Sequence, residues 1–323
     1  SIISLVPEYG LEKEKEQKEA DKLAEYKSTL TNDELEELVK KTKELKEYQD
    51  TPSSQEDLEK IPMLELSDIK REPAKDYNDV KSVDGIKIVH HNIFTNKIAY
   101  INMSFDTKCV PDELIPYMGL LGSTLSLMDT KNYTYPELTN EININCGGLA
   151  TGTALYSDKV DFSKNTIVYE VKSKALYEKV PFVLGMMEEI MYNTRFDDYK
   201  RLKEIIARIK SRLEASLMGQ GHSIAMLECC AQFSESAYYS DILRGYKYYE
   251  FIKKLDEEFE QNKTQIVDKL NKLVGYIFNK DNVIVSLTAD DEGYDCFVKA
   301  LSAKSCNIKD EHYNNSSKKL YTG

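Results

Sequence analysis

Histidine is the side chain most often used to hold a catalytic zinc ion, and the chain contains four: His90, His91, His222 and His312. His90 and His91 are adjacent in a strand-like segment, so we expect them on opposite faces, where they cannot share one ion. His222 follows Gly221 in a predicted turn, which favours a bond to a helix end over a metal. His312 lies in a stretch without pattern. Neither H-E-x-x-H nor H-x-x-E-H occurs, so the sequence predicts no metal-binding residue.

A nucleophile is equally hard to find. No G-x-S-x-G occurs, and no phosphate-binding loop of the type G-x-x-x-x-G-K-[ST]. Cys146 precedes Gly147 and Gly148 and could pair with a distant histidine as in a thiol protease. We favour the simpler interpretation, in which the two glycines end a helix. The sequence therefore predicts no catalytic residue, and it does not identify substrate-binding residues.

The cysteines are scattered, without a C-x-x-C pair, in a chain long enough to form its own core. This pattern indicates free thiols and a reducing compartment, the cytoplasm or an organelle matrix. We expect buried thiols at four of the six positions: Cys109, Cys146, Cys229 and Cys230. Cys296 and Cys306 are the other two.

Composition excludes two classes of partner. The 323 residues carry a net charge of −12, which disfavours a nucleic-acid partner because that needs a basic face. No apolar run approaches the length that spans a membrane. The opening heptapeptide, SIISLVP, lacks a positive start and a cleavage site, so it is not a signal peptide, and no targeting segment is recognisable.

The charged residues concentrate before residue 70. Residues 1–10 begin with a strand-like run that has no nearby partner, so we expect the end strand of a preceding domain. Residues 11–60 predict a charged helical hairpin that acts as a linker; Thr31 and Glu34 fit a capping box at its second helix. Residues 61–79 predict an extended connector, since Pro62 and Pro73 oppose a helix. Residues 307–323 resemble a tail towards a missing following domain.

Residues 80–306 predict the folded body. Residues 98–105 alternate apolar and polar as in a half-buried strand, and residues 114–128 change to helical spacing. Continued along the chain, the order is β-β-α-α-β-β-α-α-α-α-α-β-α. This predicts an α+β fold, a mostly antiparallel sheet with helices packed on one face.

Tyrosine is abundant, with 22 residues and no tryptophan. Five of them cluster after the long helices: Tyr238, Tyr239, Tyr246, Tyr248 and Tyr249. Half-buried packing is the simpler interpretation, and a peptide-contacting surface is the alternative.

Several segments, in order and spacing, resemble the middle of the pitrilysin/insulinase-type zinc metallopeptidases, in the presequence-protease and falcilysin branch. The resemblance covers nearly the whole chain. It is carried by the charged helices at 21–27 and 45–52, and by residues 61–69 (IPMLELSDI), 89–96 (VHHNIFTN), 116–122 (PYMGLLG) and 221–223 (GHS).

The resemblance implies an enzyme of two halves, each of two similar α+β domains, joined by a helical hairpin and closing around a chamber. It implies that residues 80–306 are the third domain, a non-catalytic repeat of the zinc-binding first one. Residues 117–121 (YMGLL) stand where the zinc motif would be needed, and these side chains cannot bind zinc or activate water. The zinc ion would lie outside this segment.

From this resemblance we expect a segment of a zinc metallo-endopeptidase, a peptide-degrading hydrolase, that is inactive alone and forms chamber wall and closure surface. Its expected partners are the N-terminal catalytic half of the same polypeptide and peptide substrates. The alternative is a stand-alone scaffold or peptide-binding protein without protease activity.

Overall fold

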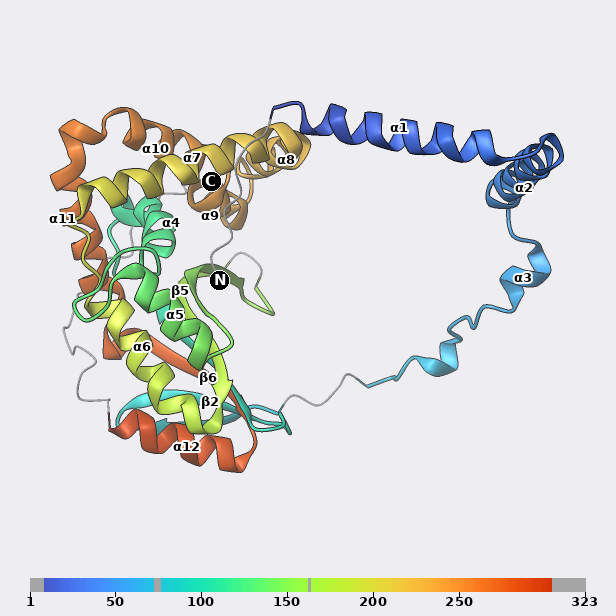
Figure 1. The fold of residues 1–323 in the computed structure, drawn as a ribbon. Coiled ribbons are helices and arrows are strands. Elements are labelled where there is room, and N and C mark those ends of the chain that lie inside the picture. Colours follow the sequence, from blue (N-terminus) through green and yellow to red (C-terminus); the bar gives the residue numbers. More distant parts are fainter. Residues whose placement is uncertain (1–8, 73–76, 162–163, 304–323) are drawn as a thin grey trace. The chain divides into compact units, whose positions relative to one another are not determined.

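A computed structural model describes residues 9–72, 77–161 and 164–303. The chain divides into two compact units, Ser1–Ala74 and Lys75–Gly323 (Figure 1). The strand predicted at the start of the chain and the tail 307–323 lie outside the described residues.

The first unit is helical. It contains α1 (Leu11–Thr29), α2 (Asn32–Asp50), the short α3 (Gln55–Glu59) and a 3-10 turn at Leu66–Asp68. The predicted capping box is confirmed, because the backbone N–H of Glu34 donates to Thr31 Oγ1 (3.3 Å) and that of Thr31 to Glu34 Oε2 (2.8 Å). Neither α1 nor α2 buries a residue in the described structure, as their thin apolar stripes lead one to expect. The linker role of these helices stays a prediction.

The second unit is built on a six-stranded sheet: β1 (Asp79–Val83), β2 (Ile86–Asn92), β3 (Ile98–Asp106), β4 (Leu149–Ser157), β5 (Asn165–Leu176) and β6 (Val283–Ala289). The spatial order is β1-β2-β6-β3-β5-β4. Only β2 and β6 run parallel among the described pairs. The predicted mostly antiparallel α+β fold is therefore confirmed.

Strand β1 is an addition to the predicted order. It pairs with β2 through a tight turn at Asp84 and Gly85, which have φ of 50° and 82°. Asp-Gly is the residue pair that such a two-residue hairpin turn favours. The Asp-Gly pair was visible in the sequence, but residues 79–83 are too polar to be recognised as a strand from their pattern.

Nine α-helices complete the described part of the second unit: α4 (Ile115–Thr124), α5 (Tyr135–Asn145), α6 (Val180–Tyr192), α7 (Tyr199–Gly219), α8 (Gly221–Cys230), α9 (Glu235–Arg244), α10 (Tyr246–Glu257), α11 (Phe259–Ile277) and α12 (Asp291–Ser302). Helix α9 was not predicted. The apolar spacing of residues 174–192 predicts a helix over that range. This prediction is wrong at its start, because β5 continues to Leu176 and α6 begins only at Val180, with Pro181 in its first turn.

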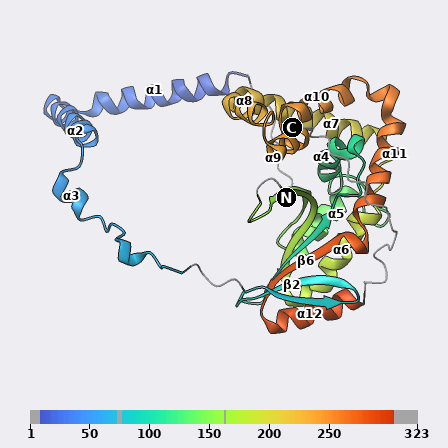
Figure 2. The same ribbon diagram turned by 180° about the vertical axis from the view of Figure 1, so that it is seen from behind.

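The two faces of the sheet have different surroundings. On β3, Ala99, Ile101, Met103 and Phe105 are at most 4% exposed, whereas Tyr100 on the other face is 45% exposed. Figures 1 and 2 show α5, α6 and α12 along one face, while α7 to α10 gather at one end of the sheet. The core therefore lies on the helix side, and no helical layer covers the opposite face in the described part of the second unit. We call it the uncovered sheet face.

Candidate functional site: an arginine-rimmed cavity and an uncovered sheet face

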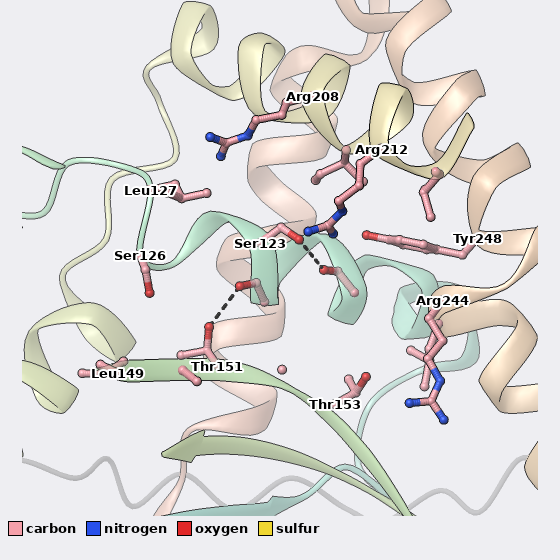
Figure 3. Close-up of a pocket in the computed structure, with 17 residues that line it drawn as sticks. Ser123, Ser126, Leu127, Leu149, Thr151, Thr153, Arg208, Arg212, Arg244 and Tyr248 are labelled. Carbon is pink, nitrogen blue, oxygen red and sulfur yellow. Dashed lines mark hydrogen bonds between the residues drawn. The ribbon is translucent and has the colours of Figure 1, made fainter. Parts of the chain in front are cut away.

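A cavity of about 660 Å³ lies where α4, β4, α7, α9 and α10 meet. Three arginines line it, Arg208 and Arg212 from α7 and Arg244 from the end of α9 (Figure 3). The other lining residues are small, apolar or hydroxyl-bearing, and none of the described ones carries a carboxylate. We refer to this space as the arginine cavity.

Helix α7 places its two arginines together. Arg208 and Arg212 are four residues apart, so both project from the same face of the helix. Buried apolar residues on the neighbouring face of α7 anchor the helix to the core: Leu202, Ile205, Ile206 and Ile209. The helix is thereby fixed while both guanidinium groups stay exposed at the cavity.

The floor of the cavity is the contact between α4 and β4. A Cβ atom on Gly122 would lie 3.2 Å from Gly152 Cα and 3.3 Å from the carbonyl oxygen of Thr151. Thr151 Oγ1 also donates to the Gly122 carbonyl (3.0 Å; Figure 3). Helix α4 and strand β4 can approach this closely because Gly122 and Gly152 carry no side chain. The space above this contact therefore remains open as the cavity.

Tyr248 of α10 forms one wall. It is 4% exposed, and its hydroxyl has no hydrogen-bond partner among the described residues. Burial raises its pKa, and the positive charge of Arg212 only partly opposes this. Figure 3 shows the hydroxyl pointing toward the guanidinium group of Arg212. A neutral buried donor therefore lies at the wall beside a cation.

The uncovered sheet face carries a separate polar network. Glu170 is 5% exposed; its Oε1 accepts from Asn102 Nδ2 (2.8 Å) and Tyr156 Oη (2.9 Å), and its Oε2 pairs with Lys172 Nζ (2.6 Å). Burial raises the pKa of Glu170, but these three partners lower it by more, so the pKa lies below its usual value. A second hollow of about 480 Å³ adjoins this network on the same face.

The histidines lie apart. His90 is 1% exposed, bonds the carbonyl of Ala289 (3.0 Å), and contacts the Tyr294 ring at a tilt of 31°, with ring centroids 4.6 Å apart. His91 lies on the other face and contacts Ser286 Oγ (3.0 Å), so the expectation of opposite faces is confirmed. His222 is exposed in the first turn of α8, and His312 lies outside the described residues.

No group of three or more histidine, cysteine or acidic side chains in the described part of the chain is placed to hold a metal ion. No described helix is long and apolar enough to cross a membrane.

The cysteine predictions hold in part. Cys109 is buried, whereas Cys146 and Cys230 are half-buried. The prediction is wrong for Cys229, which is exposed because it lies on the outer face of α8, a helix that buries no residue. The predicted glycine stop after α5 is present, because Gly148 has a φ of 103°, which suits glycine.

Of the tyrosine cluster, Tyr239 and Tyr248 are buried and the other three are half-buried. Packing is therefore the better interpretation for the cluster, with Tyr248 as the member that reaches a cavity. Sequence reasoning missed the arginine cavity. Its one available signal was Arg212, which has no acidic residue three or four positions away on α7.

Comparison with known protein families matches residues 5–255 to the family described as associated with peptidase M16, subfamily C. The match spans more than half of the chain. The chain belongs to this family. The resemblance read from the sequence is confirmed, and it identifies a peptidase-related protein.

Curated relatives agree with this assignment. Protein HypA of Clostridium perfringens is 37% identical over 319 residues, 97% of this chain and 33% of that protein. Presequence protease 1, chloroplastic/mitochondrial, of Arabidopsis thaliana is 29% identical over 285 residues, 88% of this chain and 26% of that protein. The mitochondrial presequence protease of Yarrowia lipolytica is 27% identical over 277 residues, 85% and 27% of the two chains. The chain thus spans about a quarter to a third of these relatives.

Among solved structures, a conserved protein from Enterococcus faecalis V583 is similar with a TM-score of 0.52 and 11% identity. The similarity covers 76% of this chain and 55% of that one. At this identity it supports the fold alone.

Proposed function

We propose that this chain is a non-catalytic segment of a zinc metallo-endopeptidase that degrades peptides inside a closed chamber. In this proposal the zinc ion is bound outside these residues, by the N-terminal catalytic half of the same polypeptide. The segment supplies chamber wall and a closure surface, and it is inactive alone.

The observation that carries the proposal is the environment of α4, the helix that stands where the resemblance implies a zinc motif. Tyr117, Met118 and Leu121 are at most 6% exposed and pack in the core. Tyr117 also meets Phe251 edge-on, with ring centroids 4.8 Å apart. A helix that buries apolar groups here offers no imidazole or carboxylate to a metal, so its role is packing.

The uncovered sheet face supports the wall role. A sheet with helices on only one side presents its other side as a broad surface, and here part of that surface is a hydrogen-bonded polar network around Glu170. Polar side chains suit contact with peptides of many sequences, since every peptide carries backbone donors and acceptors.

The first experiment measures cleavage of an unstructured peptide by the chain alone and by the chain combined with the remainder of the polypeptide. We expect no cleavage by the chain alone and chelator-sensitive cleavage by the combination. Chelator-sensitive cleavage by the chain alone would refute the proposal. If the chain binds peptide but combining it with the remainder of the polypeptide does not change cleavage, the result would favour a stand-alone peptide-binding protein.

The wall role is tested in the full-length enzyme with Thr288→Trp, which adds bulk on the uncovered sheet face. We expect a greater loss of cleavage rate for long peptides than for short ones. Lys299→Trp, at an exposed position of α12, is the matched control and should leave the rates unchanged. Equal effects of the two variants would argue against a wall at this face.

A further inference from the structure

We propose that the arginine cavity binds an oxyanion, the carboxylate or phosphate group of a ligand, on the guanidinium groups of Arg208, Arg212 and Arg244. This goes beyond the role proposed above and does not rest on it, because the binding groups all belong to this chain and to its second unit.

The charge around the cavity is the first argument. Guanidinium groups stay protonated in proteins, so the three arginines contribute three positive charges at any physiological pH. None of the three has an ion-pair partner within 4.0 Å among the described residues. Arg208 and Arg212 also repel each other at a four-residue spacing. In a chain with a net charge of −12, this local excess of positive charge is a feature that an anion would stabilise.

The carboxylates one turn before Arg208 and Arg244 are already paired with other cations. Glu204, one turn before Arg208, pairs with Arg201 Nη1 (3.4 Å). Asp241, one turn before Arg244, is fully buried and pairs with Lys247 Nζ (3.4 Å). Neither lines the cavity, so the described residues offer the arginines no carboxylate there.

The hydroxyl of Tyr248 is the second, independent argument. A buried hydroxyl without a partner is unfavourable, because it has lost its bonds to water and gained none. This hydroxyl points toward Arg212 (Figure 3), so an oxyanion held by Arg212 would supply the acceptor that the hydroxyl lacks. Thr153 lines the same space and adds a further hydroxyl group.

The size of the cavity suits a small molecule or the end of a peptide. About 660 Å³ falls within the range of small-molecule pockets, roughly 300–1,000 Å³. The planar fork of arginine matches the geometry of carboxylate and phosphate oxygens, often with two parallel hydrogen bonds. A carboxylate that ends a peptide and a phosphate group share this chemistry.

The test uses the whole chain, titrated at low ionic strength by calorimetry with three probes: inorganic phosphate, trialanine with a free carboxylate, and trialanine amide acetylated at its N-terminus. We expect saturable one-to-one binding of phosphate or of trialanine, and none of the neutral amide. Binding of trialanine alone assigns the site to peptide carboxylates, and binding of phosphate alone assigns it to phosphates. Absence of binding by both at millimolar concentration would overturn the proposal.

Variants locate the site. Arg212→Gln should weaken binding of the active probe about tenfold or more, because a charge-assisted hydrogen bond is lost. Tyr248→Phe should weaken it severalfold. Arg195→Gln, which removes an exposed arginine outside the cavity, is the matched control and should bind as the parent does. Equal binding by Arg212→Gln and the parent would exclude the cavity as the site. Peptidase assays do not enter this test, so it can fail without affecting the proposed function.

Discussion

Gly119 in α4 is the position where one added methyl group should have the clearest effect. A Cβ atom there would lie 2.8 Å from Cε2 of Tyr248 and 2.9 Å from the carbonyl oxygen of Leu243. Real Cβ contacts are longer, and one of these neighbours is backbone, so α4 must move away from α9 and α10. Overpacking of this kind costs about 1–3 kcal/mol. Replacing glycine by alanine inside a helix returns up to about 1 kcal/mol. We therefore expect Gly119→Ala to lower the free energy of unfolding by roughly 1–2 kcal/mol.

The assay is urea unfolding followed by tyrosine near-ultraviolet circular dichroism, which suits a chain with 22 tyrosines and no tryptophan. It reports on the second unit, where most of the buried tyrosines lie. Gly219→Ala, at the last residue of α7, is the matched control, because no atom lies within 4 Å of the added Cβ. It should be neutral or slightly stabilising. If Gly119→Ala is as stable as Gly219→Ala, the close approach described between α4, α9 and α10 is wrong.

Three further changes should shift stability by amounts that the same unfolding assay can measure. Tyr248→Phe removes an unpartnered buried hydroxyl and should raise the free energy of unfolding of the ligand-free chain by about 1 kcal/mol; a decrease would mean that the hydroxyl is bonded. Thr134→Ala removes the hydroxyl of the α5 capping box, in which Thr134 Oγ1 donates to Glu137 Oε2 (2.7 Å), and should lower the free energy of unfolding by about 1 kcal/mol. Burial raises the pKa of Glu189, but hydrogen bonds from Thr130, Asn193 and Asn132 lower it by more, so the pKa of Glu189 in the folded chain lies below its usual value. The stability that ionised Glu189 contributes is fully present above the pKa of this residue in the unfolded chain. It is lost as the pH falls through the pKa of the folded chain. Glu189→Gln should therefore lower the free energy of unfolding by about 2 kcal/mol at pH 7 and by much less at pH 3. An equal decrease at both pH values would contradict a lowered pKa for Glu189.

Local patterns predicted the elements whose signals are short-range. The alternation along β3 gave its buried face, because the strand period of two separates core from solvent directly. The capping box at Thr31 gave the start of α2 for a similar reason, since the bonded groups lie three residues apart. The adjacent histidines on β2 were placed on opposite faces by the same strand geometry.

Tertiary contacts decided what local patterns missed. Residues up to Leu176 continue β5 because they pair with β3, where Ile98 is the partner of Leu176. Their own composition also suits a helix. The arginine cavity escaped notice because Arg208 and Arg212 match the solvated face of an amphipathic helix, and Arg244 approaches them only after α7 and α9 are packed. The spacing of residues along a single sequence gives no information about this approach of Arg244 to Arg208 and Arg212.

Strand β6 lies between β2 and β3 in the sheet, although it comes last along the chain among the described strands. The family match ends at residue 255, before this strand begins at Val283. A fragment cut at that boundary would keep the two edges that β6 joins, leaving β2 and β3 with unpaired backbone groups open to pairing with other molecules. During synthesis on the ribosome, β6 cannot join β2 to β3 until residues 283–289 have been made, so the described sheet can be completed only after that point.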